Sequence, residues 1–179
     1  NGADLTVRGN AQDAIGNTMN AGRIVVRGHA GDLPAHSMRG GRIFVRGRVG
    51  YRAGIHMKAF RDRWPVLVAG ETAGDYAGEY MAGGLIVVLN LKDEPGSPVG
   101  RCLGTGMHGG TIYVRGSVES HQLGQEVGRG EITPEDGEIL ESILREYARR
   151  LDVELDIGPH EFNKFFPRTS RPYGRLYAY

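Results

Sequence analysis

The chain has 179 residues, a mass of 19.5 kDa and a formal net charge of +1, with 40% hydrophobic and 24% charged residues. These values predict one globular domain and exclude global disorder. They also exclude nucleic-acid binding that depends on a large net positive charge. No apolar run is long enough for a membrane helix. The single cysteine, Cys102, cannot form an internal disulfide, so the composition argues against a disulfide-rich secreted scaffold and favours the cytoplasm.

A repeat organises residues 1–130. Its five methionines are spaced by 19, 19, 24 and 26 residues, each with a small residue three positions earlier, and four of them with glycine three positions later. These repeat positions are Gly16, Met19, Gly22, Ala35, Met38, Gly41, Gly54, Met57, Gly78, Met81, Gly84, Gly104, Met107 and Gly110. Agreement of these positions in four or five copies indicates a structural repeat rather than chance.

Each repeat ends in a short β-branched run, such as 24–26 or 43–45, bounded by glycine, which is typical of a strand. Units of about 19 residues are too short for helix pairs and suit one coil of a parallel β-solenoid. We therefore expect an all-β fold in which the methionines form an internal ladder. The repeat accounts for the methionine stripe more simply than a cofactor site does.

Two repeats carry insertions, one after Met57 and one after Val88. Insertions in repeat proteins form loops on one face, often a contact face. The first contains Trp64 beside arginines, and both residue types are common anchors of protein interfaces. Trp64 is therefore a candidate partner contact. The equal alternative is that Trp64 is a loop residue that packs against the coils of its own chain.

Residues 131–179 are predicted to close the same domain. Thr133-Pro134 is typical of a helix start, and the following apolar residues share one helical face, which we expect to cover the open end of the solenoid. An aromatic tail follows, which is expected to dock on the solenoid or on a partner chain. Its candidate contact residues are Phe162, Phe165, Phe166 and Tyr173.

A search for chemistry finds little. The glycines of 104–109 match a dinucleotide-binding pattern, but they lead into a strand rather than a helix. No G-x-S-x-G elbow occurs, and no two histidines stand at metal-ligand spacing. We therefore assign no catalytic, cofactor-binding or metal-binding residue. The arginines that share one repeat position, whose role stays open, are Arg8, Arg27, Arg46 and Arg115.

The segments 78–89 and 104–110 resemble the G-x-x-G-x-x-x-G repeat domain that closes the large subunit of glutamate synthase and also occurs in one subunit of formylmethanofuran dehydrogenase. The segment 162–167 and the acidic helix are more similar to the glutamate synthase version. The resemblance implies a right-handed parallel β-helix that has no catalytic residues of its own. In glutamate synthase, the amidotransferase domain and the synthase domain with FMN and iron–sulfur do the chemistry.

The sequence thus predicts a non-catalytic structural subunit of a glutamate-synthase-like complex. The expected partners are chains with glutamine amidotransferase and FMN-binding synthase activity, which carry the FMN and iron–sulfur groups. Nucleic acid and membranes are not expected partners, and a homo-oligomer is left open. The alternatives are the corresponding repeat subunit of a formylmethanofuran dehydrogenase-type complex and, third, a free-standing hydrolase such as an esterase.

Overall fold

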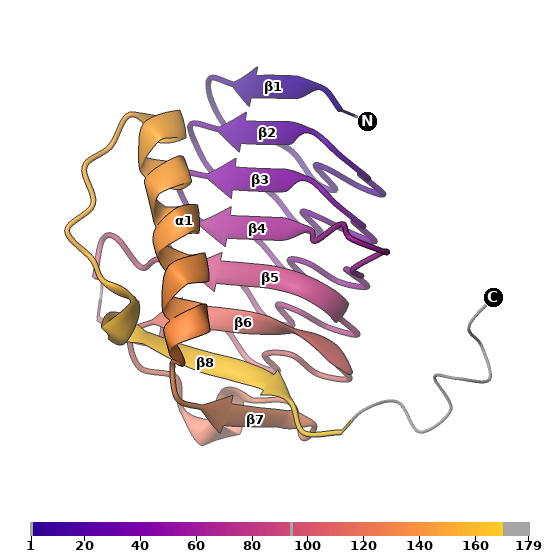
Figure 1. Cartoon of the computed structure of the whole chain (residues 1–179), viewed down its shortest axis with the longest axis vertical. Helices are drawn as coiled ribbons and strands as arrows, with labels where there is room; N and C mark the ends of the chain where they lie inside the picture. The colour runs from indigo at the N-terminus through magenta and orange to yellow at the C-terminus, as the bar shows by residue number, and fades with distance from the viewer. Residues whose placement is uncertain (1, 94, 170–179) are drawn as a thin grey trace.

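The computed structural model describes residues 2–93 and 95–169. Its strands form one eight-stranded sheet in the order β1-β2-β3-β4-β5-β6-β8-β7 (Figure 1). The elements are β1 (Asp4–Val7), β2 (Arg23–Val26), β3 (Arg42–Val45), β4 (Val66–Ala69), β5 (Ala82–Val88), β6 (Gly109–Arg115), β7 (Val127–Gly130), α1 (Pro134–Leu151) and β8 (Phe162–Pro167), with short 3-10 turns at Ser120–Gln122 and Pro159–Glu161. Strands β1 to β6 are parallel, and β8 joins β6 and β7 in antiparallel pairs.

The repeat sets the register of the parallel strands. Ile24 of β2 pairs with Ile43 of β3, and Ile86 of β5 pairs with Ile112 of β6. These inward residues share one core with the repeat methionines. Four of the five methionines are at most 1% exposed, and Met19 in the first repeat is only partly buried. Because side chains alternate along a strand, the residues between them point to the opposite face of the sheet.

That opposite face is covered by helix α1, which runs across the strands (Figure 1). Thr133 and Asp136 exchange capping hydrogen bonds at its start, and Asp152 ends it in the left-handed conformation. The buried stripe of α1 packs on outward residues of the sheet, including Phe44, whose ring meets the ring of Tyr147 edge-on at 6.0 Å.

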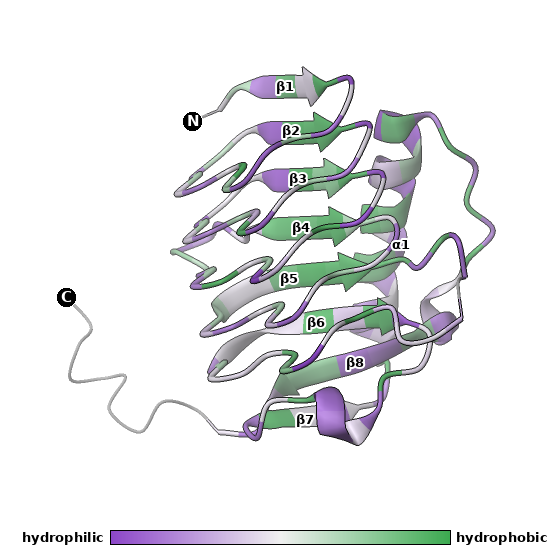
Figure 2. Ribbon diagram, turned by 180° about the vertical axis from the view of Figure 1, so that it is seen from behind, coloured by the Kyte–Doolittle hydropathy of each residue, from purple (hydrophilic) through white to green (hydrophobic). Residues whose placement is uncertain are grey.

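The prediction of an all-β right-handed parallel β-helix is wrong. The structure is a single mixed, mostly parallel sheet with one helix, an α/β-type arrangement. The physical reason lies in the glycine-rich part of each repeat, where residues such as Ala14 and Leu33 adopt positive φ. Successive turns there are joined by isolated bridges, such as Ala11 with Ala30, and by separate backbone hydrogen bonds, such as that from Thr18 N–H to the carbonyl of His36, and they do not extend into strands (Figure 2).

The expected place of the helix was also wrong. Helix α1 covers a face of the sheet, and the end of the parallel strands is closed by β8, which pairs with β6 through Phe165 opposite Ile112. The apolar face of α1 has the length to span several strands, and the outward residues of the sheet give it an apolar surface to bury. None of the helices among the described residues is both long and apolar enough to cross a membrane.

Candidate functional site

The space between the strands and the turns is filled by the repeat itself. A Cβ on Gly41 would lie 2.6 Å from Cε of Met19, and a Cβ on Gly110 would lie 2.4 Å from Cε of Met81. The methionine of one repeat therefore rests on a glycine of the next. Other repeat glycines lie against core side chains in the same way: Gly16 near Ile43, Gly54 near Ile86, Gly78 near Ile112, Gly84 near Met57 and Gly104 near Met107.

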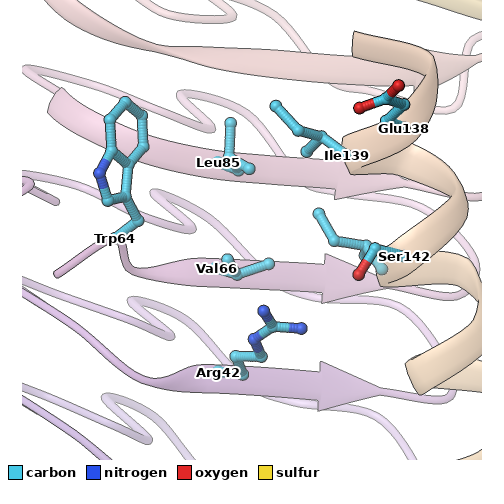
Figure 3. A pocket seen from close by; sticks show the side chains of 8 residues that line it. Arg42, Trp64, Val66, Leu85, Glu138, Ile139 and Ser142 are labelled. Atoms are coloured by element: carbon cyan, nitrogen blue, oxygen red, sulfur yellow. The ribbon is translucent and has the colours of Figure 1, made fainter. Parts of the chain in front are cut away.

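An apolar groove of about 410 Å³ opens on the other face of the sheet, between the first insertion and helix α1. Figure 3 shows Trp64 on one side, Ile139 on the other, and Val66 and Leu85 on the strands between them. The full lining is Arg42, Trp64, Val66, Leu85, Glu138, Ile139, Ser142 and Ile143. The groove is therefore built from β3, β4, β5, the insertion and α1.

The insertion holds Trp64 at the mouth of the groove. Phe60 and Arg63 close a tight turn with two backbone hydrogen bonds of 3.1 Å, and Arg61 in the turn has a φ of 58°. Trp64 follows this turn directly and is 58% exposed. An indole exposed beside an apolar floor provides a large contact area at low cost in side-chain entropy, which is a common property of interface anchors.

The helix provides the opposite wall. Leu140 and Ile143 are buried against the sheet, whereas Ile139 lies at the margin of the same stripe and is 41% exposed. Exposed apolar side chains are ordinary one at a time, but Ile139 and Trp64 border one groove. They are the two exposed apolar side chains of the groove lining, since Val66, Leu85 and Ile143 are buried.

Charged groups mark the rim. Arg42 donates a hydrogen bond to Glu146, and Arg23 donates another to the same carboxylate at 2.8 Å. Glu146 is thus held between two arginines at the edge of α1. Arg42 and Glu138 both line the groove, so its rim offers one base and one acid to a bound partner.

A second cluster of titratable groups joins β6, β8 and α1. The Tyr113 hydroxyl donates to Asp136, and the Lys164 ammonium pairs with the other oxygen of that carboxylate at 2.5 Å. Burial alone raises the pKa of Asp136, but the hydrogen bonds from Lys164 and Tyr113 outweigh it and lower the pKa to about 2. Burial and the neighbouring carboxylate raise the pKa of Tyr113. All three groups are engaged in holding the helix and β8 on the sheet.

Of the two places expected for the tail aromatics, Phe162 and Phe165 take the one on this chain's own sheet. Phe162 and Phe165 are 5% and 0% exposed, so both are buried in this chain's own cores and offer almost no surface to a partner. Phe166 is half-buried and lies against Gly130. Tyr173 lies outside the described residues. Among the predicted contact residues that lie within the described part of the chain, Trp64 is the exposed one.

The histidines and the cysteine do not converge. The rings of His36 and His56 are 6.3 Å apart, and His56 stacks on Tyr80 at 5.4 Å. Cys102 is a half-buried free thiol. Across residues 2–93 and 95–169, no group of three histidine, cysteine, aspartate or glutamate side chains is arranged to hold a metal ion.

The four arginines that share one repeat position have different surroundings in the structure. Arg8, Arg27 and Arg46 follow β1, β2 and β3 directly at their carboxyl ends. Arg115 lies three strands further along, where its Nε donates to Glu161 at 2.8 Å. Arg8, Arg27 and Arg46 therefore form a row of positive charges at three neighbouring strand ends. Arg115 instead pairs with Glu161, next to the start of β8.

Sequence reasoning missed the helix wall of the groove. The pattern of α1 predicted that Ile139 belongs to the buried stripe, but the stripe was expected on the open end of the solenoid and not on the face of the sheet. Ile139 lies at the edge of the stripe, next to the charged side of the helix, and this marginal position is the signal that could have identified it. Val66 and Leu85 were expected as strand residues only.

Comparison with known proteins places these features in a family. The family profile described as GXGXG motif matches residues 1–158, consistent with the repeat domain of glutamate synthase. An uncharacterized protein of Methanocaldococcus jannaschii is 50% identical over 185 aligned positions, which cover 99% of this chain and 70% of that protein. The match spans both the repeat and helix α1. The chain therefore belongs to the GXGXG motif family.

Proposed function

We propose that this chain is a non-catalytic structural subunit of a glutamate-synthase-like complex. In this proposal, one partner chain hydrolyses glutamine, and another partner chain, which carries FMN and iron–sulfur groups, makes glutamate from 2-oxoglutarate. The chain itself supplies a rigid surface on which these partners assemble in the cytoplasm. Membership of the GXGXG motif family supports the relation to glutamate synthase.

The use of the side chains supports a structural role. The methionines and isoleucines of the repeat fill one core, and the stripe of α1 fills the other. The ionisable residues Asp136 and Lys164 neutralise one another where three elements meet. Groups that bond to each other in this way hold the fold together and are poorly placed to take up a substrate proton.

The groove beside Trp64 is the surface that we assign to a protein partner, and it is the observation that carries the proposal. An exposed indole, an exposed isoleucine and a floor of Val66 and Leu85 favour an apolar segment of another chain. Arg42 and Glu138 on the rim favour a partner segment that carries charges of both signs. A rigid sheet beneath the groove lowers the entropy cost of binding.

Assembly from purified chains tests the proposal. The chain is mixed with the amidotransferase and FMN-binding synthase chains of the same source, and the mass of the complex is measured by size-exclusion chromatography with light scattering. We expect co-elution and glutamate formation only when the catalytic chains are present. Trp64→Ala is expected to weaken assembly at least about tenfold, because it removes the exposed indole at the mouth of the groove.

Tyr51→Ala is the matched control, since Tyr51 is a similarly exposed aromatic residue that does not line the groove. It is expected to leave assembly unchanged. Separate elution of all chains, or turnover by this chain alone, would contradict the proposal. Capture of a molybdenum or tungsten subunit instead would favour a formylmethanofuran dehydrogenase-type complex.

A further inference from the structure

The groove beside Trp64 follows a row of outward side chains that lies next to helix α1. Arg42, Val66 and Leu85 are register partners on β3, β4 and β5, so they stand side by side across the sheet. Figure 3 shows them in line along the groove, with α1 on one side and Trp64 on the other. The groove therefore crosses three strands and runs beside α1, which crosses the same strands (Figure 1).

The backbone groups of the three strands beneath the groove are engaged by neighbouring strands. Each of β3, β4 and β5 pairs with a strand on both of its sides. An extended segment laid on this face would lose water from its own N–H and C=O groups without gaining new partners, which is costly. A helix satisfies its backbone internally, and helices are the usual cover for the faces of parallel sheets. The groove therefore favours a helical segment.

The length of the groove suits about two turns of helix. Neighbouring strands lie about 4.8 Å apart, so the row from Arg42 to Leu85 spans about 10 Å. A helix covers about 11 Å in two turns, over which one face presents about three apolar side chains. Ser142 lies on the wall that α1 provides, and its short side chain allows a second helix to approach α1 closely.

The two ends of the groove carry opposite charges. Arg42 marks the β3 end, and Figure 3 shows Glu138 at the other end, beyond Leu85. Arg42 donates to Glu146, but its side chain is 38% exposed and a guanidinium has several N–H donors, so it can bind a second carboxylate. Glu138 is exposed and belongs to no ion pair among the residues that the structure describes.

We propose that the groove binds an amphipathic helix of a partner protein, packed beside α1. The apolar stripe of this helix lies between Trp64 and Ile139. An acidic residue at one end of the stripe pairs with Arg42, and a basic residue about two turns away pairs with Glu138. This inference rests on the proposed function in taking the groove as the surface for a partner protein, and it adds which kind of segment fills the groove.

A second copy of this chain is a poorer fit to the groove. The described part of the chain contains one α-helix, α1, whose apolar residues Leu140, Ile143 and Leu144 are already buried on its own sheet. A second copy therefore has no free amphipathic helix to offer from these residues. The occupant is a segment of a different protein.

Synthetic helices test the proposal. The probe is a fluorescein-labelled, alanine-rich peptide of about 18 residues, with a leucine stripe over its central two turns, a glutamate at one end of the stripe and a lysine at the other. Its binding to the 179-residue chain is measured by fluorescence anisotropy. A peptide of the same composition whose leucines are spread around the helix should bind at least about tenfold more weakly.

Two variants of the chain show whether the probe occupies the groove. W64A removes one apolar wall and should weaken binding of the probe at least about tenfold. Y51A removes an exposed aromatic residue that does not line the groove, and it should leave the dissociation constant within about twofold. Far-ultraviolet circular dichroism establishes that each variant is folded.

Charge reversal tests the two ends of the groove. Two further peptides carry glutamate at both ends of the stripe or lysine at both ends, and each should bind about threefold or more weakly than the probe. E138K makes both ends of the groove basic, so the peptide with two glutamates should then bind more tightly than the probe. E141K is the matched control, since Glu141 is exposed on the same helix but does not line the groove, and it should leave the original ranking unchanged.

Equal binding of the striped peptide and the peptide with spread leucines would overturn the proposal, and so would binding that W64A leaves unchanged. A ranking of the peptides that E138K does not alter would overturn the pairing with Glu138. Self-association of the chain that W64A abolishes would assign the groove to a second copy instead.

The peptide experiment and the assembly experiment can fail separately. Assembly with the catalytic chains, without binding of any peptide, would refute the helix and leave the proposed function standing. Peptide binding as expected, with catalytic chains that elute apart from this chain, would refute the proposed function and leave the helix-binding groove standing.

Discussion

The hydroxyl group of Tyr113 donates a hydrogen bond of 2.6 Å to the carboxylate of Asp136, and this contact joins the sheet to the first turn of helix α1. The other carboxylate oxygen accepts from Lys164 of β8 at 2.5 Å and from the backbone N–H of Thr133 at 2.8 Å. One buried side chain therefore holds β6, β8 and the helix start together. The Asp136 carboxylate therefore joins the segment that follows the repeat to the strands of the repeat.

Asp136→Asn is expected to lower the free energy of unfolding by about 3 kcal/mol, because it leaves the half-buried Lys164 ammonium without its counter-charge and weakens the helix cap. Urea denaturation measures this loss. Glu141→Gln, an exposed change on the same helix, should alter the free energy by about 0.5 kcal/mol or less. Equal effects of the two substitutions would show that the buried contact carries no special weight.

Acid unfolding is predicted to depend on the same carboxylate. The pKa of Asp136 is about 2 in the folded chain, against 3.8 for an unperturbed aspartate. The folded state therefore binds the ionised form better, so this stabilisation is fully present above about pH 4 and is lost as the pH falls toward 2. The loss amounts to about 2 kcal/mol. Unfolding free energies measured at about pH 5 and about pH 2.5 should differ by less in Asp136→Asn than in the original chain.

The pKa of Glu161 is also lowered, chiefly by the hydrogen bond from Arg115 and by the backbone N–H of Gly158. This group contributes to acid unfolding in both the original chain and the variant, so the difference between the two isolates Asp136. A pH dependence that Asp136→Asn leaves unchanged would contradict the assignment of the low pKa to this residue.

The buried methionine ladder predicts unequal effects of one substitution at two repeat positions. Met57→Ala should cost about 2–5 kcal/mol of unfolding free energy, because Met57 is fully buried and its removal leaves a cavity. Met19→Ala should cost less than half of that, since Met19 is only partly buried at the β1 end. Denaturation is measured at a concentration where the chain is monomeric. A larger loss for Met19 would refute the ordering.

The entry to β2 predicts a contrast between two glycines. Gly22 has a φ of 94°, and a Cβ there would lie 2.4 Å from the carbonyl oxygen of Ala3. Gly22→Ala should therefore destabilise the chain by at least about 2 kcal/mol. Gly9 has nothing within 4 Å of the corresponding position, and Gly9→Ala should change the unfolding free energy by about 1 kcal/mol or less. Thermal unfolding of both variants makes the comparison, and similar melting temperatures would contradict it.

The strands were predictable because the repeat is visible in the sequence. The runs 24–26 and 43–45 lie within β2 and β3, and their isoleucines pair in register. The capping residue Thr133 likewise indicated the start of α1. These are local signals, which depend on residue type and spacing and need no knowledge of distant contacts.

The fold class and the site depend on distant contacts, and these were not predictable. Nothing in the residue pattern indicates that Phe165 and Ile112 are neighbours, because an antiparallel strand that lies outside the repeat has no repeat position to fix its register. The place of α1 on the sheet face depends on the outward residues Phe44 and Val68, which the repeat pattern treated only as strand residues. The groove between Trp64 and Ile139 arises from that packing alone.

The most direct test of the structural role is the titration of this chain with the purified amidotransferase and FMN-binding synthase chains, followed by light scattering of the separated complex. The account predicts a complex of fixed stoichiometry that W64A weakens at least about tenfold and Y51A leaves intact. Catalytic chains that assemble and form glutamate equally well without this chain, and that elute apart from it, would contradict the account.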